Sequence, residues 1–79
     1  MTKKQQEYKK LLEEQLHWCR ERDSILEKIE VKLHEMKKIA EYAREDELTS
    51  FEIERLNFQL NELKSEIQSL EKQLKGVVH

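Results

Sequence analysis

The sequence predicts an all-α protein: a long antiparallel helical hairpin, or two-helix coiled coil, that dimerises into a four-helix bundle. Three observations lead to this prediction. The chain of 79 residues is 41% charged and contains no Pro and one Gly, a composition typical of long helices and coiled coils. Apolar residues recur every three or four positions along most of the chain, and a helix-start signal stands near residue 49. We treat residues 1–79 as a single domain.

The start signal predicts the point at which the chain reverses. Thr49 followed three residues later by Glu52 is a capping box, in which the Thr hydroxyl accepts the Glu52 N–H and the Glu carboxylate accepts the Thr49 N–H. Leu48 and Ile53 stand at the two positions of a hydrophobic staple. A helix therefore begins here, and the helix before it must end.

The first helix is expected at about residues 3–44. Thr2 and Gln5 form a second possible capping box at its start. The acidic run 45–47 stands where the helix dipole is negative, which disfavours continuing the helix. These signals together predict a turn at residues 45–49.

The second helix is expected at about residues 50–75, ending where Gly76 takes a left-handed conformation. Its heptad repeat is aliphatic at every core position, which is a strong coiled-coil signal. The a positions are Ile53, Leu60, Ile67 and Leu74, and the d positions are Leu56, Leu63, Leu70 and Val77.

The first helix carries a matching repeat, and the two repeats predict the register of the hairpin. Its a positions are Leu12, Cys19, Leu26, Leu33 and Ala40, and its d positions are Tyr8, Gln15, Arg22, Ile29, Met36 and Ala43. Antiparallel packing pairs residues whose numbers have a constant sum, and a sum of 96 makes six layers apolar on both sides. These layers are Ala43–Ile53, Ala40–Leu56, Met36–Leu60, Leu33–Leu63, Ile29–Ile67 and Leu26–Leu70. The alternative is one continuous helix, which requires the heptad register to slip between residues 44 and 53.

Several apolar residues are left outside this predicted core. They stand at position g of the first helix, where Lys32 interrupts the series, and at position f of the second. They are Leu11, Trp18, Ile25, Ile39, Phe51 and Phe58. An exposed apolar stripe marks an interaction surface, and we expect a second copy to cover it with C2 symmetry, giving a homodimer or higher homo-oligomer. The alternative is that they are ordinary scattered surface residues.

Residues 1–18 extend past the end of the second helix in the predicted register. Their apolar side chains then lack a partner within the monomer, and such spacing suits a helix that binds in the groove of a second chain or of another protein. These side chains are Tyr8, Leu11, Leu12, Leu16 and Trp18. Trp18 is the expected anchor, because Trp dominates interface energetics.

Charge is distributed unevenly along the chain. The first ten residues hold four Lys and one Glu, a formal charge of +3, whereas residues 41–55 hold six acidic residues and two Arg, a formal charge of −4. The Lys-rich arm leaves nucleic-acid binding open as an alternative, although it has no Arg and no dense basic face. The net charge of −2 gives no strong attraction to nucleic acid or to anionic lipid.

No constellation of residues points to catalysis or to a bound metal. His17 and Cys19 are two positions apart and point in different directions on a helix, and no Cys-x-x-Cys or His-x-x-x-His spacing occurs. There is no Gly-rich phosphate loop, and carboxylates on an open rod lack the cleft that acid–base catalysis requires. We therefore expect no enzyme, no metal and no cofactor. Short apolar runs predict no membrane span and no signal peptide, and the single Cys fits a cytoplasmic protein.

Four segments carry a family resemblance. Met36–Ala43, Leu48-Thr49, Ile53–Leu56 and Leu63–Ile67 resemble the helical hairpin in the core domain of bacterial flagellins. That family has a helix ending in a Met-Arg-x-Leu-Ala-x-x-Ala pattern, a short turn with Leu-Ser, and a returning helix with Leu and Glu-Ile. The match covers roughly residues 26–70, without the Asn- and Ala-rich terminal helices of the family. It implies a helical hairpin and a bacterial or phage origin.

Three functions are consistent with these patterns. The first is a small non-catalytic adaptor or regulator that binds proteins as a coiled-coil homo-oligomer, through the overhang and the leftover apolar residues. The second is a structural subunit or fragment of a larger coiled-coil or filament assembly, as the resemblance implies. The third is an accessory nucleic-acid-binding protein that uses the Lys-rich arm.

Overall fold

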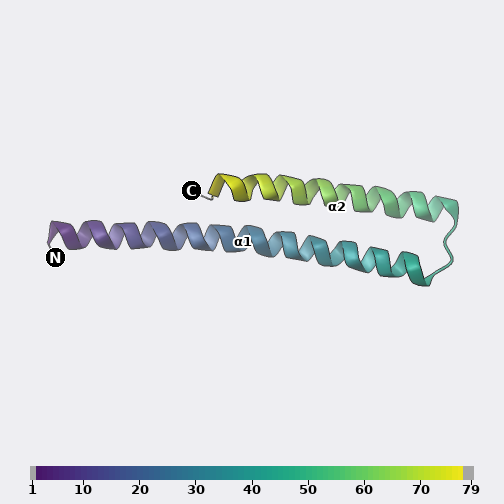
Figure 1. Ribbon diagram of the computed structural model, residues 1–79, viewed down its shortest axis with the longest axis horizontal. Coiled ribbons are helices and arrows are strands. Elements are labelled where there is room, and N and C mark those ends of the chain that lie inside the picture. The colour runs from purple at the N-terminus through teal and green to yellow at the C-terminus, as the bar shows by residue number, and fades with distance from the viewer. Residues whose placement is uncertain (1, 78–79) are drawn as a thin grey trace.

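The computed structural model describes residues 2–77 and consists of two helices, α1 (Lys3–Glu45) and α2 (Ser50–Val77). The helices run side by side in opposite directions and are joined by a short connection (Figure 1). The molecule is a rod with extents of 70 × 19 × 12 Å. The predicted helical hairpin is therefore confirmed, and the single continuous helix is wrong.

The start of α1 has the capping box that its sequence predicts. The Thr2 hydroxyl accepts the backbone N–H of Gln5 at 3.2 Å, and the Gln5 side-chain oxygen accepts the backbone N–H of Thr2 at 3.1 Å. Two N–H groups that have no partner within the helix are satisfied in this way. The helix therefore has a defined first turn even though it lies far from α2.

The reversal of the chain takes four residues, 46–49. Asp46 has an extended backbone (φ −111°, ψ 145°), and its N–H donates to the Tyr42 carbonyl at 3.2 Å, which closes the last turn of α1. Thr49 then caps α2, because its hydroxyl accepts the Glu52 N–H at 3.2 Å. The expected return bond differs: the Glu52 carboxylate accepts the Thr49 hydroxyl proton at 3.1 Å instead of the Thr49 backbone N–H.

The end of α2 differs from the sequence-based expectation. Gly76 lies within the helix, and no described glycine has a positive φ, so the predicted left-handed termination is wrong. A single Gly near a helix end costs only about 1 kcal/mol relative to Ala. The half-buried Val77 belongs to the apolar row of α2, and its packing favours continuing the helix by one more residue.

The core of the hairpin is small. Within residues 2–77, four side chains are buried: Ile25 of α1, and Leu63, Ile67 and Leu70 of α2. On α2 the remaining inward side chains are half-buried and follow the predicted a and d positions from Leu56 to Val77. Ile53 is the exception and is exposed, because α1 ends opposite the first turns of α2.

On α1 the predicted core face is wrong. The buried and half-buried positions in the paired part of α1 are d and g, whereas the repeat predicts a and d. We call this set the inward row; it consists of Ile25, Ile29, Lys32, Met36 and Ile39. Leu26 and Leu33, which the repeat predicts in core layers, are 39% and 52% exposed. Both faces are apolar at seven-residue intervals, so periodicity alone does not separate them.

An ion pair across the two helices lies close to the predicted register. Lys32 pairs with Glu66, and their numbers sum to 98, within two of the predicted 96. Several residues of α1 between His17 and Lys28 line a groove together with Gln73 of α2. α1 is therefore flanked by α2 from about residue 17. The N-terminal part of α1 continues beyond the C-terminal end of α2 (Figure 1). We call residues 3–16 the overhang.

A distance measurement tests the hairpin directly. Lys28 and Gln73 line the same groove and are both exposed, so spin labels on Cys at these positions, in a Cys19→Ser background, are expected within about 20 Å of each other. One continuous helix separates them by about 68 Å at ~1.5 Å per residue. Pulsed dipolar spectroscopy with excess unlabelled chain, which removes distances between copies, distinguishes the two.

A pair of Thr substitutions tests whether the cap at the reversal supports the whole fold. Thr49→Ala is expected to lower the free energy of unfolding by about 1 kcal/mol, because the Glu52 N–H loses its partner. Thr2→Ala is the matched control, since it removes the same kind of cap from the free end of the overhang. Equal shifts in urea denaturation for the two variants contradict the expectation.

Candidate interaction surface

The contact between the two helices includes a charged residue, Lys32 of the inward row. Its ammonium group pairs with the Glu66 carboxylate of α2, and the Lys32 side chain is partly covered. The hydrogen bond to Glu66 raises the pKa of Lys32 above its ordinary 10.5; the charges of Glu66 and Glu35 add to this effect, and partial desolvation opposes it. The apolar stem of a Lys can lie along a core while its charged end reaches solvent. A Lys is therefore tolerated at this position of the seam.

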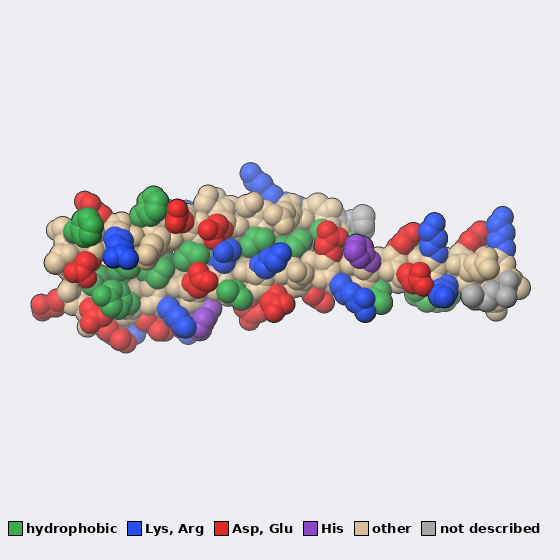
Figure 2. All heavy atoms as spheres, turned by 180° about the vertical axis from the view of Figure 1, so that it is seen from behind, with side chains coloured by type: hydrophobic (Ala, Val, Ile, Leu, Met, Phe, Trp, Pro, Cys, Tyr) green, Lys and Arg blue, Asp and Glu red, His purple; other side chains and the backbone are tan. Residues whose placement is uncertain are grey.

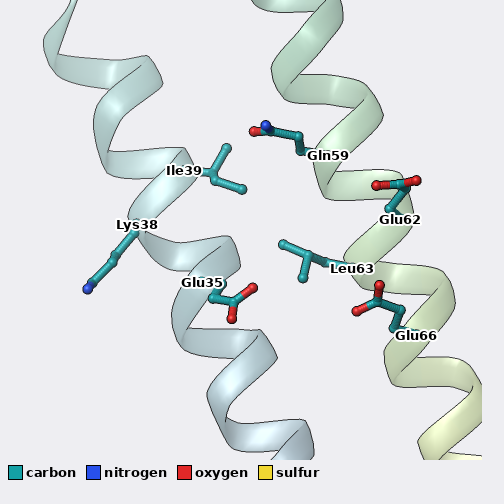
Figure 3. Close-up of a pocket in the computed structure, with 7 residues that line it drawn as sticks. All are labelled: Glu35, Lys38, Ile39, Gln59, Glu62, Leu63 and Glu66. Carbon is teal, nitrogen blue, oxygen red and sulfur yellow. The ribbon is translucent and has the colours of Figure 1, made fainter.

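One edge of the hairpin carries a groove of about 430 Å³ between α1 and α2. Ile39 and Leu63 point towards each other across its floor, and the carboxylates of Glu35, Glu62 and Glu66 lie around it (Figure 3). Lys38 points away from α2 in the same view. Acidic side chains therefore surround a groove whose floor is apolar.

The other edge of the hairpin is apolar along α1. The inward row occupies positions d and g of the heptad. Glu35 stands at c, which flanks g on the helix surface, and Leu33 stands at a, which flanks d on the opposite side. The residues on the Leu33 side recur every seven positions and are all exposed. We call them the outer row; they are Leu12, Cys19, Leu26, Leu33 and Ala40. Large apolar side chains gathered in this way are the feature that marks an interaction surface.

Three of the six predicted interface residues are exposed. Phe51 and Phe58 are on the side of α2 away from α1, and Phe51 is 73% exposed. Leu11 lies in the overhang and is also exposed. Trp18 is half-buried near the end of α2, and the guanidinium of Arg22 lies 5.8 Å from the centre of its ring, a cation–π contact.

The other two predicted interface residues belong to the core of the hairpin. Ile25 is 6% exposed, so the expectation that it faces away from α2 is wrong. Ile39 is half-buried and points towards Leu63 of α2 (Figure 3), so the same correction applies. The heptad repeat predicts both outside the core, because its core positions are a and d and both residues stand at g. In the structure g faces α2, and Lys32, the charged member of that series, pairs with Glu66.

The residues predicted at the turn fix the start of α2 and do not belong to the outer row. Thr49 and Glu52 form the cap described above, Leu48 is half-buried, and Ile53 is exposed at the tip. Acidic side chains gather at the tip, whereas acidic and basic side chains both project from the overhang at the opposite end (Figure 2). The overhang holds four Lys and three Glu, a formal charge of +1, so the two ends of the rod differ in charge mainly because the tip is acidic.

The described residues offer no arrangement suited to metal binding. Within residues 2–77, no three His, Cys, Asp or Glu side chains lie where they could hold a metal ion together, and this includes the three carboxylates around the groove. The Cys19 thiol is free and exposed. Neither helix, over the part described, has the length and apolar character needed to cross a membrane.

The comparisons leave the family of the chain open. No known protein family, no curated protein and no solved structure matches it. The resemblance to the flagellin hairpin therefore stays a prediction. Function has to be inferred from the surface of the molecule itself.

The pH dependence of stability tests the ion pair in the seam. A raised folded-state pKa means that the stabilisation by Lys32 is fully present below pH 10.5 and is lost as the pH rises through the higher folded value. Wild type is therefore expected to melt above Glu66→Gln at about pH 9 and to lose this advantage by about pH 12. Glu62→Gln, in the same groove, is the control. A wild-type advantage that is equal at both pH values contradicts the expectation.

Proposed function

We propose that this protein is a small, non-catalytic coiled-coil interaction module, an adaptor or regulator that acts as a homo-oligomer. One observation carries the proposal: the described chain buries four large apolar side chains and leaves eleven exposed. The exposed ones are Tyr8, Leu11, Leu12, Leu16, Leu26, Val31, Leu33, Tyr42, Phe51, Ile53 and Phe58. Such a monomer leaves many large apolar side chains in contact with water, and association with another chain covers them.

Two sets of exposed residues have different proposed roles. The part of the outer row from Cys19 to Ala40 runs alongside the hairpin core and is the surface for self-association. The overhang residues Tyr8, Leu12 and Leu16 follow one another every four positions on a helix that α2 does not flank. Such a helix is suited to binding in the groove of a partner. The free thiol of Cys19 is compatible with the cytoplasm as the place of action.

A structural subunit of a larger assembly is the second candidate. The four Lys in the first part of the overhang and the acidic tip favour it, because the tip of one copy then attracts these Lys side chains of the next. Head-to-tail contacts that do not close into a ring give open filaments. Light scattering at low and high salt separates the two candidates, since filaments of this kind dissolve in salt whereas an apolar dimer persists.

Sedimentation equilibrium tests the proposed self-association. Wild type is expected to be a dimer or a higher oligomer at micromolar concentration. Leu33→Glu is expected to weaken association at least tenfold, because it places a charge in the outer row and loses the burial of a Leu, about 1.5–3 kcal/mol.

The matched control is Val31→Glu. Val31 is 54% exposed, nearly the same exposed fraction as Leu33. It stands two residues before Leu33 and therefore lies on a different face of α1. Helicity measured by circular dichroism checks that both variants keep the hairpin. A wild-type chain that stays monomeric up to about 100 μM overturns the proposal, because that corresponds to less than about 5.5 kcal/mol of association free energy.

A further inference from the structure

The outer row of α1 has charged neighbours whose sign changes along the helix. A charged residue follows four positions after each of its last four members, and all four charged residues are exposed. They are Asp23, Glu30, Lys37 and Arg44. The half nearer the overhang is acidic and the half nearer the tip is basic. A face of this kind is complementary to a second copy that runs antiparallel, whereas a parallel copy meets like charges along its whole length.

We propose that the outer row docks on the outer row of a second copy of this chain, antiparallel, about a two-fold axis near Glu30. This inference rests on the proposed self-association and adds its orientation and register. Pairing residues whose numbers sum to about 60 sets Leu26 of one copy against Leu33 of the other. Asp23 of one copy then faces Lys37 of the other, and both contacts occur twice in the dimer because the interface is isologous.

The geometry of α1 permits this contact while the hairpin stays intact. In a seven-residue repeat, the seam formed by the outer row and its charged neighbours lies roughly 100° around the helix from the inward row. A helix that meets two neighbours at such an angle is the unit of a four-helix bundle. Each copy of α1 therefore packs on its own α2 through one face and on the second α1 through the other. Glu30 approaches its own counterpart at the axis, so this one like-charge contact opposes the two Asp23–Lys37 pairs.

Cys19 makes the orientation measurable. In the proposed register Cys19 faces Ala40 of the second copy, while the two Cys19 residues lie about 32 Å apart along the axis (21 residues at ~1.5 Å). Ala40→Cys is therefore expected to form a covalent dimer when oxidised glutathione is added, and wild type is expected to remain unlinked. Lys38→Cys is the matched control, because Lys38 points to another side of α1 (Figure 3).

The outcomes of the cross-linking separate the alternatives. A covalent dimer of wild type that forms as fast as that of Ala40→Cys indicates parallel helices and overturns the inference. Equal linking of Lys38→Cys and Ala40→Cys indicates random collision and also overturns it. If wild type sediments as an oligomer but Ala40→Cys does not link, the proposed self-association stands and this interface is wrong. If wild type is monomeric, both fail.

A charge exchange gives an independent readout. Asp23→Lys is expected to weaken the dimer about tenfold, because two favourable pairs become two like-charge pairs. Adding Lys37→Asp in the same chain is expected to restore the dissociation constant to within about threefold of wild type. A double variant that is weaker than either single variant overturns the pairing of Asp23 with Lys37.

Discussion

The packing of one row of α1 against one row of α2 is the interaction on which the whole structure depends. Over residues 2–77 it is the only contact between helices, and the four buried side chains all lie along it. A core of this size in a short chain supplies little stability of its own. The cap at Thr49 matters for the same reason, because it fixes where the chain turns back and hence which residues of the two helices meet.

The rotation of α1 links the core to the surface that is left for association. Because α1 presents its d and g positions to α2, the apolar residues at its a positions remain outside the hairpin. A helix with two apolar faces has room for two helical neighbours, and the hairpin supplies only one. The second edge carries a groove with Ile39 and Leu63 on its floor and Glu35, Glu62 and Glu66 around it. The two edges therefore differ in charge, because carboxylates surround the groove of one whereas the outer row along the other is uncharged.

Most of the fold could be predicted from the sequence, because its signals are local. The caps at Thr2 and Thr49 and the aliphatic repeat of α2 each depend on residues a few positions apart. The face of α1 could not be predicted in the same way, because two apolar series compete there. Local spacing also does not show that Lys32, the charged member of one series, pairs with Glu66, which lies 34 positions away. The exposure of Phe51 and Phe58 followed from the α2 repeat. Ile25 and Ile39 belong to the face of α1 that packs on α2. Because the prediction of that face is wrong, the prediction that these two residues lie outside the core is wrong as well.

The position of Lys32 has a consequence for the accuracy of folding. A coiled coil built from similar heptads can slide by seven residues and still bury its apolar positions, so apolar packing alone discriminates poorly between alignments. In this chain a slide of one heptad in either direction brings Gln59 or Gln73 to the place of Glu66. Both are uncharged, so each slipped hairpin leaves the Lys32 charge without its counter-ion. The ion pair thus favours the observed alignment over a slide in either direction, by the small amount that a partly exposed ion pair contributes.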